Sequence, residues 1–86
     1  MQQLPSSRSC YVCGRENPVS LHMTFFLQDN GEVISELVVP EAYAGYPGMV
    51  HGGNFVAMMD EAAGRAVTGD QPNRFTVTSQ LTVKYR

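Results

Sequence analysis

Polar and apolar residues alternate in two stretches of the chain and repeat with a helical period in a third. Alternation is typical of strands, whose successive side chains lie on opposite faces. It predicts strands at about 19–27 and 75–85. A stretch rich in β-branched residues predicts another strand at about 32–39. Between this strand and the one at 75–85, about 53–67 has helical spacing and predicts the only long helix. The order strand, strand, helix, strand indicates an α+β fold.

Turn residues separate these elements. Asn30-Gly31 is a hairpin signal between the first two strands, and Pro40 ends the second strand. The segment 69–73 ends the helix. The loop before the helix contains Tyr43 and Tyr46, which either pack the loop down, the favoured interpretation, or line a pocket.

The helical spacing also predicts which face of the helix is buried. At 100° per residue, one apolar stripe forms, made of Phe55, Met59, Ala62, Ala63 and Ala66. Val56 and Val67 extend one side of this stripe, and Met58 extends the other. An apolar stripe of this kind is ordinary core material. We therefore expect no cofactor.

Length and charge exclude several classes of protein. The 86 residues allow one small domain. A net charge of −2 with only six Lys and Arg argues against nucleic-acid binding, and no apolar run approaches the roughly 18 residues of a membrane span. We expect 1–9 to be a mobile leader and 10–86 a single domain. Because 1–9 has no signal-peptide pattern, we expect a cytoplasmic protein.

Cys10 and Cys13 form a CxxC pair. Such a pair can be half of a zinc site or a redox motif. No second CxxC follows, and His22 and His51 lack zinc-finger spacing. The favoured interpretation is a packed turn before the first strand, without a metal, and a metal or redox module remains the alternative.

Two adjacent carboxylates in the helix have different surroundings. Glu61 precedes Arg65 by four residues, which favours a surface ion pair. Asp60 has no such partner on its own helix and lies at the border of the apolar stripe. It either reaches solvent or a backbone group in another element, or serves as a nucleophile or general base at the rim of a pocket.

The start of the helix offers a second chemical group. Gly52 and Gly53 leave the backbone amides uncovered, and such amides can stabilise a developing oxyanion. Asp60 follows Gly52 by eight residues, about 12 Å along the axis at 1.5 Å per residue. Both cannot reach one carbonyl within one straight helix. This distance predicts a dimer in which antiparallel helices share the site.

Several short motifs now resemble a known family, the hotdog-fold acyl-CoA thioesterases of the phenylacetate-degradation (PaaI-like) group. Residues 46–53 read Tyr-Pro-Gly-Met-Val-His-Gly-Gly, and 58–62 read Met-Met-Asp-Glu-Ala. Cys-Tyr-Val-Cys-Gly at 10–14 with Asn-Pro at 17–18, and the ending at 81–86, are also similar. The resemblance covers nearly the whole chain.

The resemblance implies a long central helix wrapped by a curved antiparallel sheet. It implies hydrolysis of an acyl-CoA thioester to a free acid and CoA. Asp60 would be the nucleophile or general base, and the Gly52 amide would polarise the thioester carbonyl. His51 would shape that loop and Gly53 would open the helix. The sites of this family are shared between subunits, which agrees with the distance argument.

The candidate substrate-binding residues are Gly53, Phe55 and Tyr46. Relatives continue past Arg86 with at least two more strands, so we expect a partial hotdog domain that lacks its C-terminal strands. Either the chain is truncated, or partner chains complete its sheet by swapping or edge pairing. The alternative function is a catalytically inactive homo-oligomeric hotdog remnant, or a small-molecule-binding protein.

Overall fold

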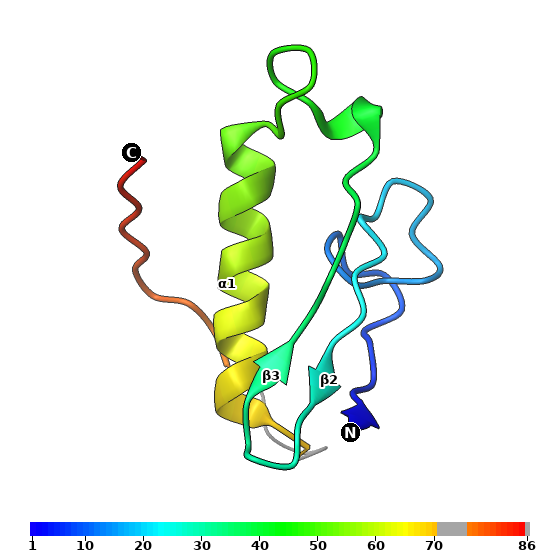
Figure 1. The fold of residues 1–86 in the computed structure, drawn as a ribbon, viewed down its shortest axis with the longest axis vertical. Coiled ribbons are helices and arrows are strands. Elements are labelled where there is room, and N and C mark those ends of the chain that lie inside the picture. Colours follow the sequence, from blue (N-terminus) through cyan, green and yellow to red (C-terminus); the bar gives the residue numbers. More distant parts are fainter. Residues whose placement is uncertain (71–75, 86) are drawn as a thin grey trace.

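The computed structural model describes residues 1–70 and 76–85 (Figure 1). Its elements, in chain order, are β1 (Gln2–Gln3), β2 (Phe26–Leu27), β3 (Val33–Ile34), the 3₁₀ helix η1 (Glu41–Tyr43) and α1 (Gly52–Thr68). The fold is therefore α+β, as predicted, with one long helix beside a small sheet.

The sheet has three antiparallel strands in the order β1-β2-β3. The β2–β3 hairpin turns where the Asn-Gly signal predicted it. Gly31 has a φ of +90° and donates its N–H to the Gln28 carbonyl at 3.0 Å. A positive φ is readily adopted only by residues without a Cβ, so the choice of glycine here sets the turn.

The first two predicted strands are longer than the strands of the structure. Only Phe26–Leu27 and Val33–Ile34 are strands, although burial alternates as expected from Leu21 to Phe25. His22 has a φ of +54°, which interrupts the extended backbone. Residues 21–25 also lie beside the CxxC turn rather than beside a strand. Met23 donates its N–H to the Val12 carbonyl at 2.9 Å. The predicted lengths are therefore wrong, although burial along 21–25 alternates as the sequence pattern predicts.

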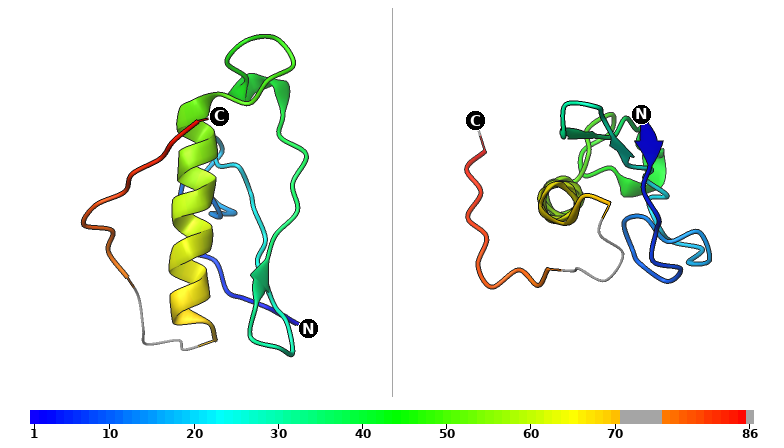
Figure 2. Two further views of the ribbon diagram at one scale, coloured as in Figure 1. Left: turned by 60° about the vertical axis from the view of Figure 1, so that its left-hand side comes forward. Right: turned by 90° about the horizontal axis from the view of Figure 1, so that it is seen from below.

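The third predicted strand is not formed in the described residues. Residues 76–85 have no strand assignment, and position 75 lies outside the described part of the chain. This segment runs along the side of α1 that faces away from β2 and β3 (Figures 1 and 2). A strand requires a hydrogen-bonded neighbour, and α1 separates this segment from the sheet.

The core lies between α1 and the residues that precede it. Its buried members are Leu4, Val12, Cys13, Leu21, Met23 and Phe25. From α1, Ala57, Met58 and Ala62 pack against it. The predicted buried stripe is wrong in its phase, because of its five members only Ala62 packs against this core. Phe55 and Met59 are 47% and 45% exposed.

The ends of α1 agree with the prediction to within one residue. The spacing predicted about 53–67, and the helix spans Gly52–Thr68. Gly69 has a φ of +55° and donates its N–H to the Arg65 carbonyl at 2.8 Å, which ends the helix. The rest of the predicted helix stop, 71–73, lies outside the described residues. No helix in 1–70 or 76–85 is long and apolar enough to cross a membrane.

Part of the predicted leader makes ordered contacts. Gln2–Gln3 form β1, and Leu4 is buried and donates its N–H to the Phe25 carbonyl at 2.8 Å. These contacts add a third strand to the hairpin. Mobility of the segment 1–9 and its division from 10–86 stay predictions.

Candidate functional site

The start of α1 is capped by a histidine. His51 is the N-cap residue, and its Nδ1 accepts the N–H of Gly53 at 2.9 Å. Its own N–H binds the Tyr43 carbonyl at 3.0 Å, which fixes the loop to the helix. The N–H of Gly52 has no hydrogen-bond partner among the residues that the structure describes. One amide at the positive end of the helix dipole is therefore available as a donor.

The segment after α1 returns to the helix start. Tyr85 donates its hydroxyl to the Gly52 carbonyl at 2.9 Å. A Cβ at Gly52 would lie 3.4 Å from the Tyr85 hydroxyl oxygen, so the ring lies directly against the glycine.

Asp60 has a partner from another element. The Thr78 hydroxyl donates to Asp60 Oδ1 at 2.6 Å, and Asp60 itself is half-buried. Thr78 lies outside α1, which agrees with the prediction that Asp60 has no partner on its own helix. A carboxylate held through one oxygen keeps a defined orientation. The role of Asp60 as nucleophile or general base stays a prediction.

The predicted catalytic residues lie on one helix, but not at one point. His51 and Gly52 are at its first turn, and Asp60 follows two turns later. Eight residues of helix correspond to about 12 Å along the axis. One chain therefore does not bring the Gly52 amide and the Asp60 carboxylate to a common carbonyl.

The predicted substrate-binding residues are largely exposed. Phe55 is 47% and Tyr46 is 78% exposed. Tyr43, in the same loop as Tyr46, packs down as expected. It donates its hydroxyl to the Ser20 carbonyl at 3.0 Å, and its ring makes an edge contact with Tyr11 at 6.3 Å between centroids.

A second group of reactive side chains lies where the CxxC turn meets α1. Cys10 Sγ is 3.7 Å from Glu61 Oε1, and Cys13 Sγ is 3.5 Å from Glu61 Oε2. Arg65 donates from Nε to Glu61 at 3.0 Å and from an Nη to Cys13 Sγ at 3.1 Å. The predicted Glu61–Arg65 ion pair is confirmed. Its surface location is wrong, because the Arg65 and Glu61 side chains are only 15% and 24% exposed.

Burial and hydrogen bonding act in opposite directions on this group. Burial raises the pKa of the Cys13 thiol, and this exceeds the lowering by hydrogen bonds with the Ser7 backbone and with Arg65. Burial by itself lowers the pKa of the Arg65 guanidinium. Its hydrogen bonds with Cys13 and Glu61 outweigh that effect, so the pKa is raised. Arg65 is thus a fixed positive charge beside two thiols and a carboxylate.

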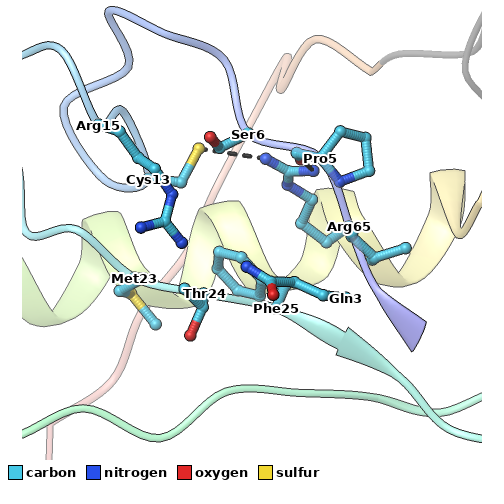
Figure 3. Close-up of a pocket in the computed structure, with 10 residues that line it drawn as sticks. Gln3, Pro5, Ser6, Cys13, Arg15, Met23, Thr24, Phe25 and Arg65 are labelled. Carbon is cyan, nitrogen blue, oxygen red and sulfur yellow. Dashed lines mark hydrogen bonds between the residues drawn. The ribbon is translucent and has the colours of Figure 1, made fainter. Parts of the chain in front are cut away.

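A cavity of about 320 Å³ adjoins this second group. Figure 3 shows Cys13 and Arg65 on one wall, with Arg15 and Phe25 close by. None of the predicted catalytic or substrate-binding residues lines it. A smaller cavity of about 80 Å³ lies in the loop before His51 and is lined in part by Met49 and Val50.

Comparison with known proteins finds a family model that is similar to the helix half of the chain. Residues 47–86 match the model of the thioesterase superfamily, just under half of the chain. No curated protein and no solved structure matches the chain. The matched region begins in the loop before His51 and includes α1. One central helix with a small antiparallel sheet is consistent with a partial hotdog fold.

The sequence did not predict three contacts. Thr78 on Asp60 and Tyr85 on Gly52 come from a segment that was expected to be a strand. Glu61 contacts Cys10 and Cys13, which precede it in the chain by 51 and 48 residues. Local periodicity carries no information on such distant pairs. The only signal was the CxxC motif itself, which marks cysteines without naming their partner.

Proposed function

We propose that this chain is a hotdog-fold acyl-CoA thioesterase of the PaaI-like type, which hydrolyses an acyl-CoA thioester to a free acid and CoA. The observation that carries the proposal is the thioesterase-superfamily match over 47–86, which includes His51, Gly52 and Asp60. An enzyme that hydrolyses a thioester needs an oxyanion donor and a base or nucleophile. The chain offers one candidate for each.

The Gly52 amide is the oxyanion donor in this proposal. His51 occupies the neighbouring Gly53 N–H, whereas the Gly52 N–H is unpartnered among described residues. A thioester carbonyl oxygen that gains negative charge would be stabilised by this N–H and by the helix dipole.

Asp60 is the base or nucleophile. As a base, it takes a proton from water while the water oxygen adds to the thioester carbonyl carbon, and the CoA thiolate then leaves. As a nucleophile, its carboxylate adds to that carbon directly and the CoA thiolate leaves, and water then hydrolyses the resulting anhydride to the free acid and the Asp60 carboxylate. In either case the Thr78 hydroxyl orients the carboxylate through Oδ1.

The site is shared between two copies of the chain. Antiparallel α1 helices would place Gly52 of one subunit opposite Asp60 of the other, which removes the separation of about 12 Å within one helix. Phe55 and Met59 lie on α1 between these two positions and are 47% and 45% exposed. Their exposure supports an apolar contact between helices or with an acyl group. Acyl-CoA and a second copy of the chain are thus the proposed partners.

The first test is release of free CoA from phenylacetyl-, benzoyl- and hexanoyl-CoA. We expect Asp60→Asn to lower kcat by about 10²–10⁴-fold, the usual contribution of a general base. The matched control is Glu36→Gln, which neutralises an exposed carboxylate in another part of the chain. Equal turnover in Asp60→Asn and Glu36→Gln would contradict the assignment. No turnover from a folded wild-type oligomer would favour an inactive remnant or a binding protein.

A mixing experiment tests the shared site. Gly52→Pro removes the donor N–H at the first helical position, where proline is well tolerated. Asp60→Asn and Gly52→Pro should each be inactive alone. A dimer of one of each keeps one intact site, so a random equal mixture should recover about a quarter of wild-type activity in a two-fold dimer. No recovery after co-refolding would place both groups in one subunit.

A further inference from the structure

We propose that Cys10, Cys13 and Glu61 bind one zinc-class divalent metal ion, which ties the CxxC turn to α1. Their ligand atoms, two sulfurs and a carboxylate oxygen, all lie within 4.8 Å of one another. Both cysteines precede the region that matches the thioesterase superfamily, and Glu61 lies within it. The inference is independent of the proposed function.

The distances agree with a tetrahedral zinc site. Zinc binds cysteine sulfur at about 2.3 Å and carboxylate oxygen at about 2.1 Å. At the tetrahedral angle these lengths place sulfur and oxygen about 3.6 Å apart. The structure has 3.7 Å between Cys10 Sγ and Glu61 Oε1, and 3.5 Å between Cys13 Sγ and Glu61 Oε2. The two distances run to different oxygens of Glu61, and one ligand atom from each of the three residues lies within 4.8 Å of the other two. This separation suits ligands that share one small ion.

The turn that carries the cysteines is tightly built. Val12 donates its N–H to Cys10 Sγ at 3.3 Å, and Gly14 donates its N–H to the Cys10 carbonyl at 2.8 Å. A Cβ at Gly14 would lie 2.5 Å from the Cys10 nitrogen and 2.7 Å from the Arg8 carbonyl oxygen. Backbone N–H donors to ligand atoms orient them and tune their basicity. The turn therefore holds both sulfurs on one side, toward α1.

The charges of the group also suit a divalent cation. Two thiolates and the Glu61 carboxylate sum to three negative charges, which a divalent ion and the Arg65 guanidinium neutralise. Arg65 already donates to Cys13 Sγ at 3.1 Å and to Glu61 at 3.0 Å. It can keep both contacts as an outer donor while the ion takes the space between the ligands. Binding releases the two thiol protons to solvent.

Three protein ligands leave one tetrahedral position open. Water fills that position in zinc sites of this kind. Cys10 is half-buried and Cys13 is buried, so the ion would be partly accessible from the Cys10 side. The main effect we expect is structural, because the ion links residue 10 to residue 61 and closes a long loop.

Cobalt(II) titration of the reduced chain tests the site. We expect one equivalent to bind, with sulfur-to-cobalt charge-transfer absorption for two thiolates and d–d bands of tetrahedral geometry. Zinc(II) should displace the cobalt and raise Tm, and a chelator should reverse the rise. Glu61→Gln should weaken binding at least tenfold, and Glu36→Gln, on an exposed carboxylate outside the group, should leave it unchanged.

The cysteine variants complete the test. Cys10→Ser and Cys13→Ser should each lose one thiolate-to-cobalt band component and bind more weakly than wild type. If either variant fails to fold, the intensity of the wild-type charge-transfer band still counts the thiolates. A reduced, folded wild-type chain that takes up neither cobalt nor zinc would overturn the proposal. So would cobalt binding that Glu61→Gln leaves unchanged.

Discussion

Arg65 is the side chain whose removal should cost most stability outside the buried apolar core. It donates to Glu61 at 3.0 Å and to Cys13 Sγ at 3.1 Å, and it also binds the Pro5 carbonyl. Its guanidinium carbon lies 5.4 Å from the centroid of the Phe25 ring. A single residue of α1 thus contacts the N-terminal segment, the CxxC turn and Phe25, the residue just before β2. Arg65→Ala removes all of these contacts together.

The expected loss follows from the burial of these contacts. A partly buried hydrogen bond to a charged group contributes about 1.5–3 kcal/mol, and a cation–π contact contributes about 0.5–1 kcal/mol. The Arg65 and Glu61 side chains are 15% and 24% exposed, so solvent screens the pair only partly. We take the lower end for the ion pair and add the remaining contacts. Arg65→Ala should then lower the free energy of unfolding by about 3 kcal/mol.

The chain contains a matched control. Arg8 and Glu16 also form an ion pair, but their side chains are 84% and 59% exposed. Exposed pairs contribute about 0–1 kcal/mol, so Arg8→Ala should have a small effect. Urea unfolding of both variants, followed by far-UV circular dichroism and compared at constant m-value, measures the difference. Equal losses in Arg65→Ala and Arg8→Ala would refute the reasoning from burial.

Three further predictions concern single contacts. Gly14→Ala should lower the free energy of unfolding by about 1–3 kcal/mol through overpacking against backbone, whereas Gly45→Ala, whose Cβ would make ordinary contacts at 3.4 Å or more, should change it little in the same urea assay. His51→Ala should lower the free energy of unfolding by about 1 kcal/mol because α1 loses its N-cap. His51→Asn should restore most of that loss, and a failure to restore it would show that the cap does not stabilise α1. If Asp60 acts as proposed, Thr78→Val should lower kcat about fivefold, the equivalent of about 1 kcal/mol, with KM nearly unchanged; a change in KM alone would point to substrate contact instead.

The helix and the hairpin could be predicted from the sequence because their determinants are local. The period of apolar residues and the stop at Gly69 place α1 to within one residue at each end. The Asn30-Gly31 pair places the hairpin, since Gly31 adopts a positive φ. Capping and turn residues act on backbone within a few positions of themselves. Their effect is therefore readable without knowledge of the tertiary fold.

The face of the helix could not be predicted in the same way. The sequence pattern favours the stripe through Phe55 and Met59 as the buried face of the helix. In the structure, Ala57 and Met58 pack against the core instead. Periodicity reports that a face is apolar, and not which neighbour covers it. Two apolar faces on one helix are compatible with two neighbours, of which the sheet is one. The exposed face is the one on which the proposed second subunit would lie.

The adjacent carboxylates of α1 connect the two proposals. Successive residues of a helix point about 100° apart, and here Glu61 faces the CxxC turn while Asp60 faces Thr78 of the following segment. A metal ion that fixes Glu61 against the turn also fixes the rotation of α1 about its axis, and with it the direction of Asp60. The CxxC turn, which lies outside the thioesterase-superfamily match, would then orient a catalytic carboxylate within it. If both proposals hold, removal of zinc by a chelator should lower the rate of CoA release, although the ion contacts no atom of the reacting thioester.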